Sequence, residues 1–356
     1  MTQKVLFVLP VLEAGGGQRF VSNVANYFAK KGHSITVLSL RKGESFYPLD
    51  SNVKLKTLNY VPIQTENKLK RFSSRIETFF ELRSTLLEIG PDFVYSILSS
   101  TNLLTIASTL FSGIPIYVND VMSPLRHRTK LERFARRALY RKADGIICMT
   151  REAREIVAKE TGAENIEVIP RPLKEMKTPD SKERTKTILN VGRLHPDKGQ
   201  GDLLEAFAQL KNDEWRLVFL GDGPSKGELI KKRKELNLVE RVSFLGTVAE
   251  VDSWYYSSSI FAFTSYNEGF PNALSEAMHA SLACVSYDCV SGPKEMIDHQ
   301  VSGLLVPVGD IDSMAKALDR LIENKDLCEE LGRNAHRASK RFCLENISNQ
   351  ILEFCS

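Results

Sequence analysis

The chain has 356 residues and a mass of 40.1 kDa, with 42% apolar and 26% charged residues. This composition excludes a disordered or fibrous chain, and the length predicts two domains that each bury a core. Lys and Arg outnumber Asp and Glu by 48 to 44, but the charge is unevenly divided. Residues 1–175 hold 26 basic and 17 acidic residues, whereas residues 176–356 hold 22 and 27. A basic half is therefore followed by an acidic half.

Short apolar runs alternate with amphipathic segments, which is typical of parallel sheets covered by helices on both faces. The first half predicts strands at 5–9, 35–40, 53–58, 93–97, 116–118, 145–149 and 168–169, and helices at 20–31, 69–89, 102–111, 131–141 and 152–159. The second half predicts strands at 187–191, 216–220, 242–245, 260–263, 283–287 and 304–306, and helices at 201–211, 225–236, 272–280, 312–323 and 326–340. We therefore expect an α/β fold with two doubly wound domains.

Residues 170–184 contain three prolines and a run of charges, which interrupt any regular element. We expect the linker here, with a first domain over 1–172 and a second over 173–340.

Residues 93–119 carry no charge over 27 positions but include eight Ser and Thr residues. We interpret them as strand, helix and strand rather than a membrane span. Six cysteines without CxxC spacing argue against zinc and favour a reducing cytosol.

Ligands of open α/β sheets bind beyond the carboxyl ends of the strands, so the strand-to-helix turns are the candidate sites. The first turn holds Gly15, Gly16 and Gly17, which allow backbone amides to approach an anion. A simple tight turn is the alternative. Arg193 and Lys198 follow the first strand of the second domain and suit the charge of a diphosphate, although loop cations are often only solvated.

The turn that follows the strand at 260–263 carries the most chemistry. Glu268 lies in the loop, and Glu276 lies one to two turns into the following helix. The two carboxylates can flank a ligand, while amides near Asn272 and Ala273 receive anionic oxygens. This arrangement suits sugar or ribose hydroxyls next to phosphate.

In this order the motifs resemble the retaining GT-B glycosyltransferases of family 4. They are Gly-Arg193-Leu…Lys198-Gly, Gly-Asp222-Gly-Pro and Glu268-Gly-Phe-Pro-Asn-Ala-Leu-Ser-Glu276, whose Glu pair matches the family's E-x7-E motif. The chain is most similar to bacterial members that build lipopolysaccharide, capsule and exopolysaccharide. The resemblance is strong over 187–325 and weaker over 1–170. It implies a GT-B fold, two Rossmann-like domains facing each other across a cleft.

The resemblance also implies a division of roles. The domain at 1–172 would bind the acceptor, the domain at 173–340 the donor, and segment 341–356 would pack back on the first domain. Arg193 and Lys198 would neutralise the donor diphosphate, Glu268 would hold the transferred sugar, and Glu276 would bond the ribose. Backbone groups would complete the donor site at Gly16, Gly17, Gly246, Val248, Asn272, Ala273 and Leu274.

Many family members carry a His near the reacting sugar, after a strand of the first domain. The corresponding stretch 116–124 has none. Asp120 either orients the acceptor there or is an ordinary loop residue, and His127 is expected at the surface. For His195, a structural role is expected over a catalytic one.

The expected activity is retaining transfer of a hexose or N-acetylhexosamine. The donor would be a nucleotide sugar, UDP-linked, and the acceptor an undecaprenyl-diphosphate-linked or other lipid-linked saccharide. The leaving phosphate would take the acceptor proton, so we expect no enzymic nucleophile, metal or cofactor. The alternatives are a GT-B sugar-nucleotide epimerase or phosphorylase, and an inactive sugar-nucleotide-binding subunit.

Residues 125–142 are rich in Arg and Lys and predict a basic amphipathic helix. We expect its apolar stripe to pack inward and its basic face to meet anionic lipid; a merely solvated face is the alternative. Nucleic acid is not expected, because aromatic and basic residues do not interleave. The protein would be cytoplasmic, held at the inner face of the cytoplasmic membrane by its basic half. The apolar stripe of the helix predicted within 125–142 consists of Leu131, Phe134, Ala138 and Leu139.

Overall fold

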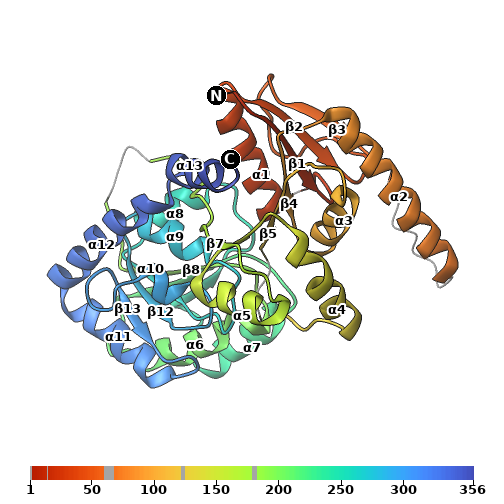
Figure 1. The fold of residues 1–356 in the computed structure, drawn as a ribbon. Coiled ribbons are helices and arrows are strands. Elements are labelled where there is room, and N and C mark those ends of the chain that lie inside the picture. Colours follow the sequence, from red (N-terminus) through yellow and green to blue (C-terminus); the bar gives the residue numbers. More distant parts are fainter. Residues whose placement is uncertain (1, 14, 60–67, 122–124, 179–182) are drawn as a thin grey trace. The chain divides into compact units, whose positions relative to one another are not determined.

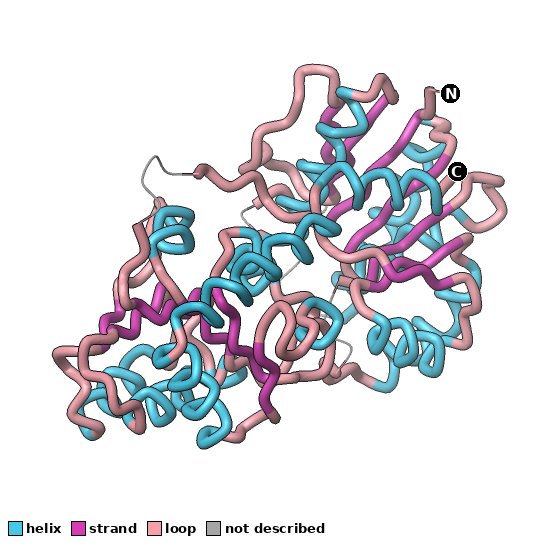
Figure 2. The backbone as a smooth tube through the Cα atoms, turned by 90° about the vertical axis from the view of Figure 1, so that its left-hand side faces the viewer, coloured by secondary structure: helices cyan, strands magenta, loops and turns pink. Residues whose placement is uncertain are grey.

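The chain folds into two compact units, and each unit contains one parallel β-sheet covered by helices (Figure 1, Figure 2). The computed structural model describes residues 2–13, 15–59, 68–121, 125–178 and 183–356. Unit 1 comprises Met1–Pro172 together with Leu344–Ser356, and unit 2 comprises Leu173–Cys343.

The sheet of unit 1 has seven parallel strands. They are β1 (Lys4–Leu9), β2 (Ser34–Ser39), β3 (Lys54–Thr57), β4 (Phe93–Ile97), β5 (Ile116–Asp120), β6 (Gly145–Cys148) and β7 (Ile166–Val168). Their order is β3-β2-β1-β4-β5-β6-β7, and β1 pairs with both β2 and β4, so that Val5 lies opposite Ile35 and Phe93. Every residue of β4 is buried, as expected for a strand covered on both faces.

Helices cover both faces of this sheet. They are α1 (Gly16–Lys30), α2 (Lys68–Ile89), α3 (Ser99–Thr109), α4 (Lys130–Leu139), α5 (Arg151–Thr161) and α13 (Leu344–Phe354), with a 3-10 turn at Tyr140–Lys142. Helices α1 and α13 share one apolar cluster with the sheet, whereas α2, α3 and α5 share another. Ile347 and Ile351 of α13 are fully buried, so the C-terminal helix completes the core beside α1.

Unit 2 repeats this architecture on six parallel strands. They are β8 (Thr187–Val191), β9 (Arg216–Leu220), β10 (Val242–Phe244), β11 (Ile260–Phe263), β12 (Ala283–Tyr287) and β13 (Leu304–Val306), in the order β10-β9-β8-β11-β12-β13. The helices are α6 (Gln200–Ala208), α7 (Lys226–Glu235), α8 (Val251–Ser257), α9 (Asn272–His279), α10 (Pro293–Met296), α11 (Ile311–Glu323) and α12 (Lys325–Ser339), with 3-10 turns at Pro196–Lys198 and Lys340–Phe342. The strand order reverses between β8 and β11, which is where such sheets bind ligands.

The predicted α/β architecture is confirmed, with local differences. Strand β7 begins two residues earlier than predicted, and the short helices α8 and α10 were not predicted from the sequence. The uncharged stretch 93–119 forms β4, α3 and most of β5, as expected. Among the described residues, no helix has the length and apolar content to cross a bilayer.

The expectation that the apolar stripe of α4 packs inward is wrong. Leu131 is 76% exposed and Phe134 is 72% exposed, and Ala138 is exposed as well. Only Leu139 is half-buried and contacts an apolar cluster. The inward position of the helix is taken by Arg136, whose side chain is fully buried.

Buried polar partners explain why Arg136 faces inward. Its guanidinium donates from Nη2 to Oδ2 of Asp120 at 2.6 Å and from Nε to Oε2 of Glu160 at 3.3 Å. A third bond runs from Nη1 to the hydroxyl of Tyr140 at 2.8 Å, and the guanidinium also lies over that ring. Burial alone would lower the pKa of Arg136, but the charge of Asp120 raises it, so the cation is held in place. The pair fixes which side of α4 faces the sheet.

Removing this cation should destabilise unit 1. In Arg136→Met the carboxylate of Asp120 stays buried without a counter-charge, which typically costs about 3–5 kcal/mol. The free energy of unfolding in urea measures the loss. Arg137→Met alters an exposed neighbour and should change that free energy by less than about 0.5 kcal/mol. Equal stabilities of the two variants would contradict a structural role for Arg136.

Candidate active site

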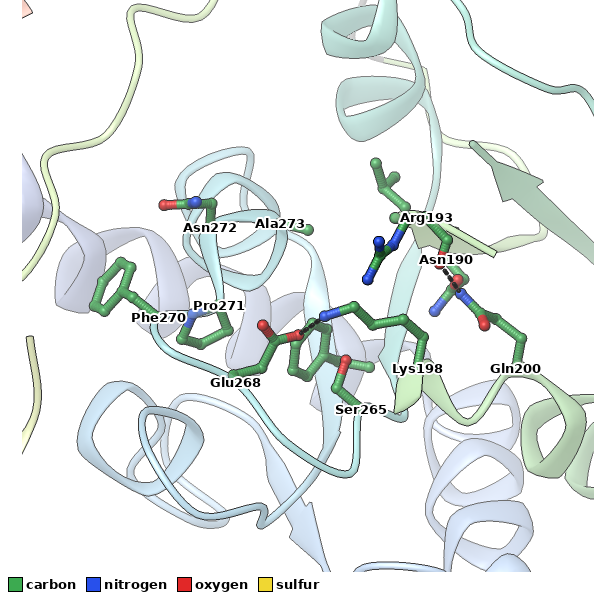
Figure 3. Close-up of a pocket in the computed structure, with 13 residues that line it drawn as sticks. Asn190, Arg193, Lys198, Gln200, Ser265, Glu268, Phe270, Pro271, Asn272 and Ala273 are labelled. Atoms are coloured by element: carbon green, nitrogen blue, oxygen red, sulfur yellow. Dashed lines mark hydrogen bonds and ion pairs between the residues drawn. The ribbon is translucent and has the colours of Figure 1, made fainter. Parts of the chain in front are cut away.

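Two loops at the carboxyl edge of the unit 2 sheet form the candidate site. One runs from the end of β8 through the turn Pro196–Lys198, and the other joins β11 to α9. Because β8 and β11 are neighbouring parallel strands, their following loops emerge side by side. The loops enclose a cavity of about 200 Å³ (Figure 3). Its polar and loop residues include Asn190, Arg193, Lys198, Gln200, Ser265, Glu268, Pro271, Asn272 and Ala273.

An ion pair between Lys198 and Glu268 crosses the cavity. The Nζ atom of Lys198 lies 2.7 Å from Oε1 of Glu268, and the two side chains are only 20% and 13% exposed. Partial burial protects the pair from screening by salt. A ligand phosphate would compete with Glu268 for Lys198 and release the carboxylate for a neighbouring hydroxyl.

Arg193 supplies a second and more accessible cation. Its side chain is 61% exposed, and its Nη2 atom lies 3.9 Å from Oδ2 of Asp197, a long contact. The backbone carbonyl of Arg193 accepts a hydrogen bond from Gln200 at 3.1 Å, which fixes the loop beneath the side chain. Figure 3 shows Arg193 and Lys198 projecting toward the same space. Two cations beside one carboxylate can bind a diphosphate next to a hydroxylated group.

The start of α9 offers fewer free amides than the sequence suggested. The amide of Asn272 donates to the carbonyl of Phe270 at 3.0 Å, and that of Leu274 to Pro271 at 3.1 Å. Within the described residues, the Ala273 amide has no backbone acceptor outside its own helix. An anion at this helix N-terminus would therefore meet the Ala273 amide first.

Other predicted donor residues of unit 2 lie outside the cavity lining. Glu276 is buried in α9. The pKa of the nearby Tyr255 hydroxyl is raised, first by the burial of Tyr255 and then by the negative charge of Glu276. Gly246 follows β10 with a φ of 70°, and its carbonyl accepts from the Gly221 amide at 2.8 Å. Val248 follows half-buried in the same loop. Their roles toward a donor stay predictions.

The predicted site residues of the first half belong to unit 1. Gly16 and Gly17 begin α1, and a Cβ atom on Gly17 would lie 3.2 Å from the side chain of Ile97. Asp120 is the last residue of β5 and is buried in its pair with Arg136, so the alternative of an ordinary loop residue is wrong. A role in acceptor binding stays a prediction.

The sequence analysis expected His127 at the surface and a structural role for His195. His127 is exposed. His195 contacts Oδ1 of Asp197 through Nδ1 at 2.6 Å and caps the 3-10 turn, which is the structural role expected.

Hydrogen bonds that no sequence motif indicates hold the second loop to α6 and to the first loop; we call the group around Asp202 the clamp. Asp202 of α6 accepts hydrogen bonds from the hydroxyls of Tyr266 at 2.7 Å and Tyr287 at 3.0 Å. Burial and the bond to Asp202 raise the pKa of Tyr266 to about 12, so its hydroxyl stays a donor at neutral pH. The amide of Tyr266 also donates to the Asp197 carbonyl at 2.9 Å, and the Thr264 hydroxyl donates to the Lys198 carbonyl at 2.9 Å. The loops of Lys198 and Glu268 are thereby fixed to each other.

Comparison with known proteins decides the family. Residues 14–174 match the family described as Glycosyltransferase Family 4, and residues 173–338 match Glycosyl transferases group 1. The two matches are continuous and together span nearly the whole chain. The chain belongs to glycosyltransferase family 4.

Relatives of this family 4 glycosyltransferase match either nearly its full length or about half of it. One, from Campylobacter jejuni, is 29% identical over 98% of this chain and 97% of its own. It is named GalNAc-α-(1→4)-GalNAc-α-(1→3)-diNAcBac-PP-undecaprenol α-1,4-N-acetyl-D-galactosaminyltransferase. A lipopolysaccharide 1,6-galactosyltransferase of Salmonella typhimurium is 32% identical over 48% of this chain and 50% of its own.

Solved structures establish the fold of the glycosyltransferase as GT-B. The structure of HepE from Anabaena in complex with UDP matches with a TM-score of 0.83 over 98% of both chains, at 20% identity. Within the described residues, no group of three or more His, Cys, Asp and Glu side chains could hold a metal ion.

Close backbone contacts at Gly199 give a test of the loop geometry. Gly199 has a φ of 58°, and an added Cβ atom would lie 2.2 Å from the carbonyl oxygen of Thr264. Gly199→Ala should therefore lower the free energy of unfolding by more than about 1 kcal/mol, because strain and clash combine. Urea unfolding measures the change.

A matched glycine provides the control. Gly227 lies in α7 with no atom within 4 Å of an added Cβ, so Gly227→Ala should stabilise the protein by up to about 1 kcal/mol. If Gly199→Ala stabilised the protein as Gly227→Ala does, the two loops would not be in contact at Gly199.

Proposed function

We propose that the chain is a retaining transferase that moves a hexose or N-acetylhexosamine from a UDP-linked donor to a lipid-linked saccharide. The observation that carries the proposal is the cavity in which Arg193 and Lys198 converge beside Glu268. Paired cations suit a leaving diphosphate, and an adjacent carboxylate suits the hydroxyls of the sugar attached to it.

Unit 2 binds the donor in this proposal. Arg193 and Lys198 hold the diphosphate, Glu268 holds the sugar, and the amide of Ala273 receives an anionic oxygen. Glu276 bonds the ribose, and the loop of Gly246 and Val248 receives the base. The complex of HepE with UDP supports the choice of nucleotide. Gly16 and Gly17 are proposed to supply further backbone contacts, whereas the amides of Asn272 and Leu274 already donate within their own turn.

The chemistry needs no enzymic nucleophile. The acceptor hydroxyl oxygen forms a bond to the anomeric carbon on the face from which the nucleoside diphosphate leaves, while the bond from that carbon to the phosphate oxygen breaks. The proton of the hydroxyl passes to the departing phosphate oxygen. Lys198 and Arg193 stabilise the negative charge that develops there. Because these cations are part of the chain, no metal or cofactor is required in the proposed step.

Unit 1 binds the acceptor in this proposal, with Asp120 near the acceptor hydroxyl. The acceptor is an undecaprenyl-diphosphate-linked or similar saccharide, as the name of the Campylobacter relative supports. Such a substrate lies in a membrane, so the protein works at the inner face of the cytoplasmic membrane, where basic unit 1 meets anionic lipid. Both family matches are to glycosyltransferases, which favours transfer over epimerisation, phosphorolysis or binding alone.

Removing either cation should slow transfer. Arg193→Ala and Lys198→Ala should each lower kcat by about 10²–10³, the usual loss when one preorganised donor to a developing anion is removed. Release of UDP from a UDP-sugar in the presence of lipid-linked acceptor measures the rate. Lys231→Ala, at an exposed cation on α7, should leave the rate unchanged. Normal turnover in both site variants would end the proposal.

A panel of nucleotide sugars tests the donor. The donor that the enzyme uses should raise the melting temperature most, and the effect should disappear in Glu268→Ala if that residue holds the sugar.

Two further measurements test the proposed step itself. Turnover that survives a chelator supports metal independence. The anomeric configuration of the product, determined by NMR, tests retention. A product of inverted configuration would refute the proposed mechanism.

A further inference from the structure

Helix α4 presents an unusual outward surface. Its exposed positions include Leu131, Phe134 and Ala138, at the i, i+3 and i+7 spacing that places them on one stripe. Lys130, Arg133, Arg137 and the following Arg141 form a second stripe beside it at the same kind of spacing, and all four are exposed. We call the exposed residues of α4 the α4 face; it comprises Lys130, Leu131, Arg133, Phe134, Arg137 and Ala138.

Among the described residues, the positive charge of the α4 face is not compensated by an ion pair. Its acidic neighbour, Glu132, is half-buried and accepts a hydrogen bond from the Ser99 hydroxyl at 3.2 Å. In the described part of the chain, Lys130, Arg133 and Arg137 form no ion pair. Exposed cations that alternate with large apolar side chains match a surface that is both anionic and apolar.

Unit 1 holds this face outward rigidly. Arg136 is the buried residue of the helix, and its bonds to Asp120 of β5 and Glu160 of α5 prevent rotation of the helix about its axis. Helix α4 also packs between α3 and α5 (Figure 1). Leu131 and Phe134 are therefore exposed because a buried charge requires it, not because α4 is loosely attached.

We propose that the α4 face docks on an anionic bilayer, with Leu131 and Phe134 inserted at the acyl boundary and the cations on lipid phosphates. An interfacial helix of this kind combines apolar insertion with attraction to anionic headgroups. The inference deepens the membrane part of the proposed function. Vesicle binding needs neither donor nor acceptor, so docking and sugar transfer can fail separately.

The full-length protein should sediment with vesicles that contain phosphatidylglycerol and not with vesicles of phosphatidylcholine alone. Phe134→Ser and Leu131→Ser should each weaken binding to the anionic vesicles by about tenfold, because an apolar side chain no longer enters the lipid. Both residues are exposed, so unchanged melting temperatures will show that the fold is intact. Glycerol phosphate should not displace the protein, since a soluble phosphate offers no apolar phase.

Phe111 provides a matched control. It is 100% exposed in unit 1, between α3 and β5, in the stretch 93–119 that carries no charge. Phe111→Ser should therefore leave vesicle binding unchanged. If Phe111→Ser weakens binding as much as Phe134→Ser does, exposed apolar surface in general causes it and the α4 face is not the docking site.

The cations need a second pair of variants. Arg133→Gln combined with Arg137→Gln should weaken binding to anionic vesicles at least about tenfold, at about 1 kcal/mol per cation near the lipid surface. Lys231→Gln combined with Lys325→Gln removes two exposed cations of unit 2 and should have no effect. Equal sedimentation with neutral and anionic vesicles, or binding that none of the α4 variants alters, would overturn the proposal. Retention of the protein by an acidic protein but not by lipid would do the same.

Discussion

The ion pair between Lys198 and Glu268 joins two loops that are far apart in the chain, and the candidate site depends on it. The two loops are also fixed to each other by the hydrogen bonds of Tyr266 and Thr264 and by the close approach of Gly199 to Thr264. The pair therefore closes a gap whose width the backbone has already set. In the proposed function, a diphosphate entering this gap would replace one negative partner of Lys198 with another, so the cation would keep a counter-charge.

A buried cation has a comparable effect in unit 1. Arg136 satisfies Asp120 at the end of β5 and so connects the carboxyl edge of the sheet to α4. The periodicity of residues 131–139 alone predicts the opposite orientation of the helix. That prediction fails because satisfying two carboxylates outweighs the burial of Leu131 and Phe134, whose exposure costs less than a buried charge without a partner.

The sequence predicted the sheets well because parallel strands covered on both faces consist of continuous apolar runs, such as residues 93–97. It also predicted that Arg193, Lys198 and Glu268 share one site, because their motifs resemble a known family. It did not reveal the pairing of Arg136 with Asp120 and Glu160, or the clamp at Asp202, whose partners are distant in the sequence and share no motif. The amides of Asn272 and Leu274 illustrate another limit, since whether an amide at a helix start is free depends on local turns that residue types do not specify.

The assignment of α13 to unit 1 determines the order in which the chain can fold. Ile347 and Ile351 complete the core beside α1, yet they leave the ribosome only after the whole of unit 2 has been made. The apolar residues of α1 that pack against α13 therefore stay exposed while unit 2 is synthesised and folds. Exposed apolar surface of this kind favours aggregation. The same arrangement means that the peptide crosses between the units twice, at Pro172–Leu173 and at Cys343–Leu344. A single proteolytic cut at either crossing leaves the units covalently joined, so separating them takes two cuts.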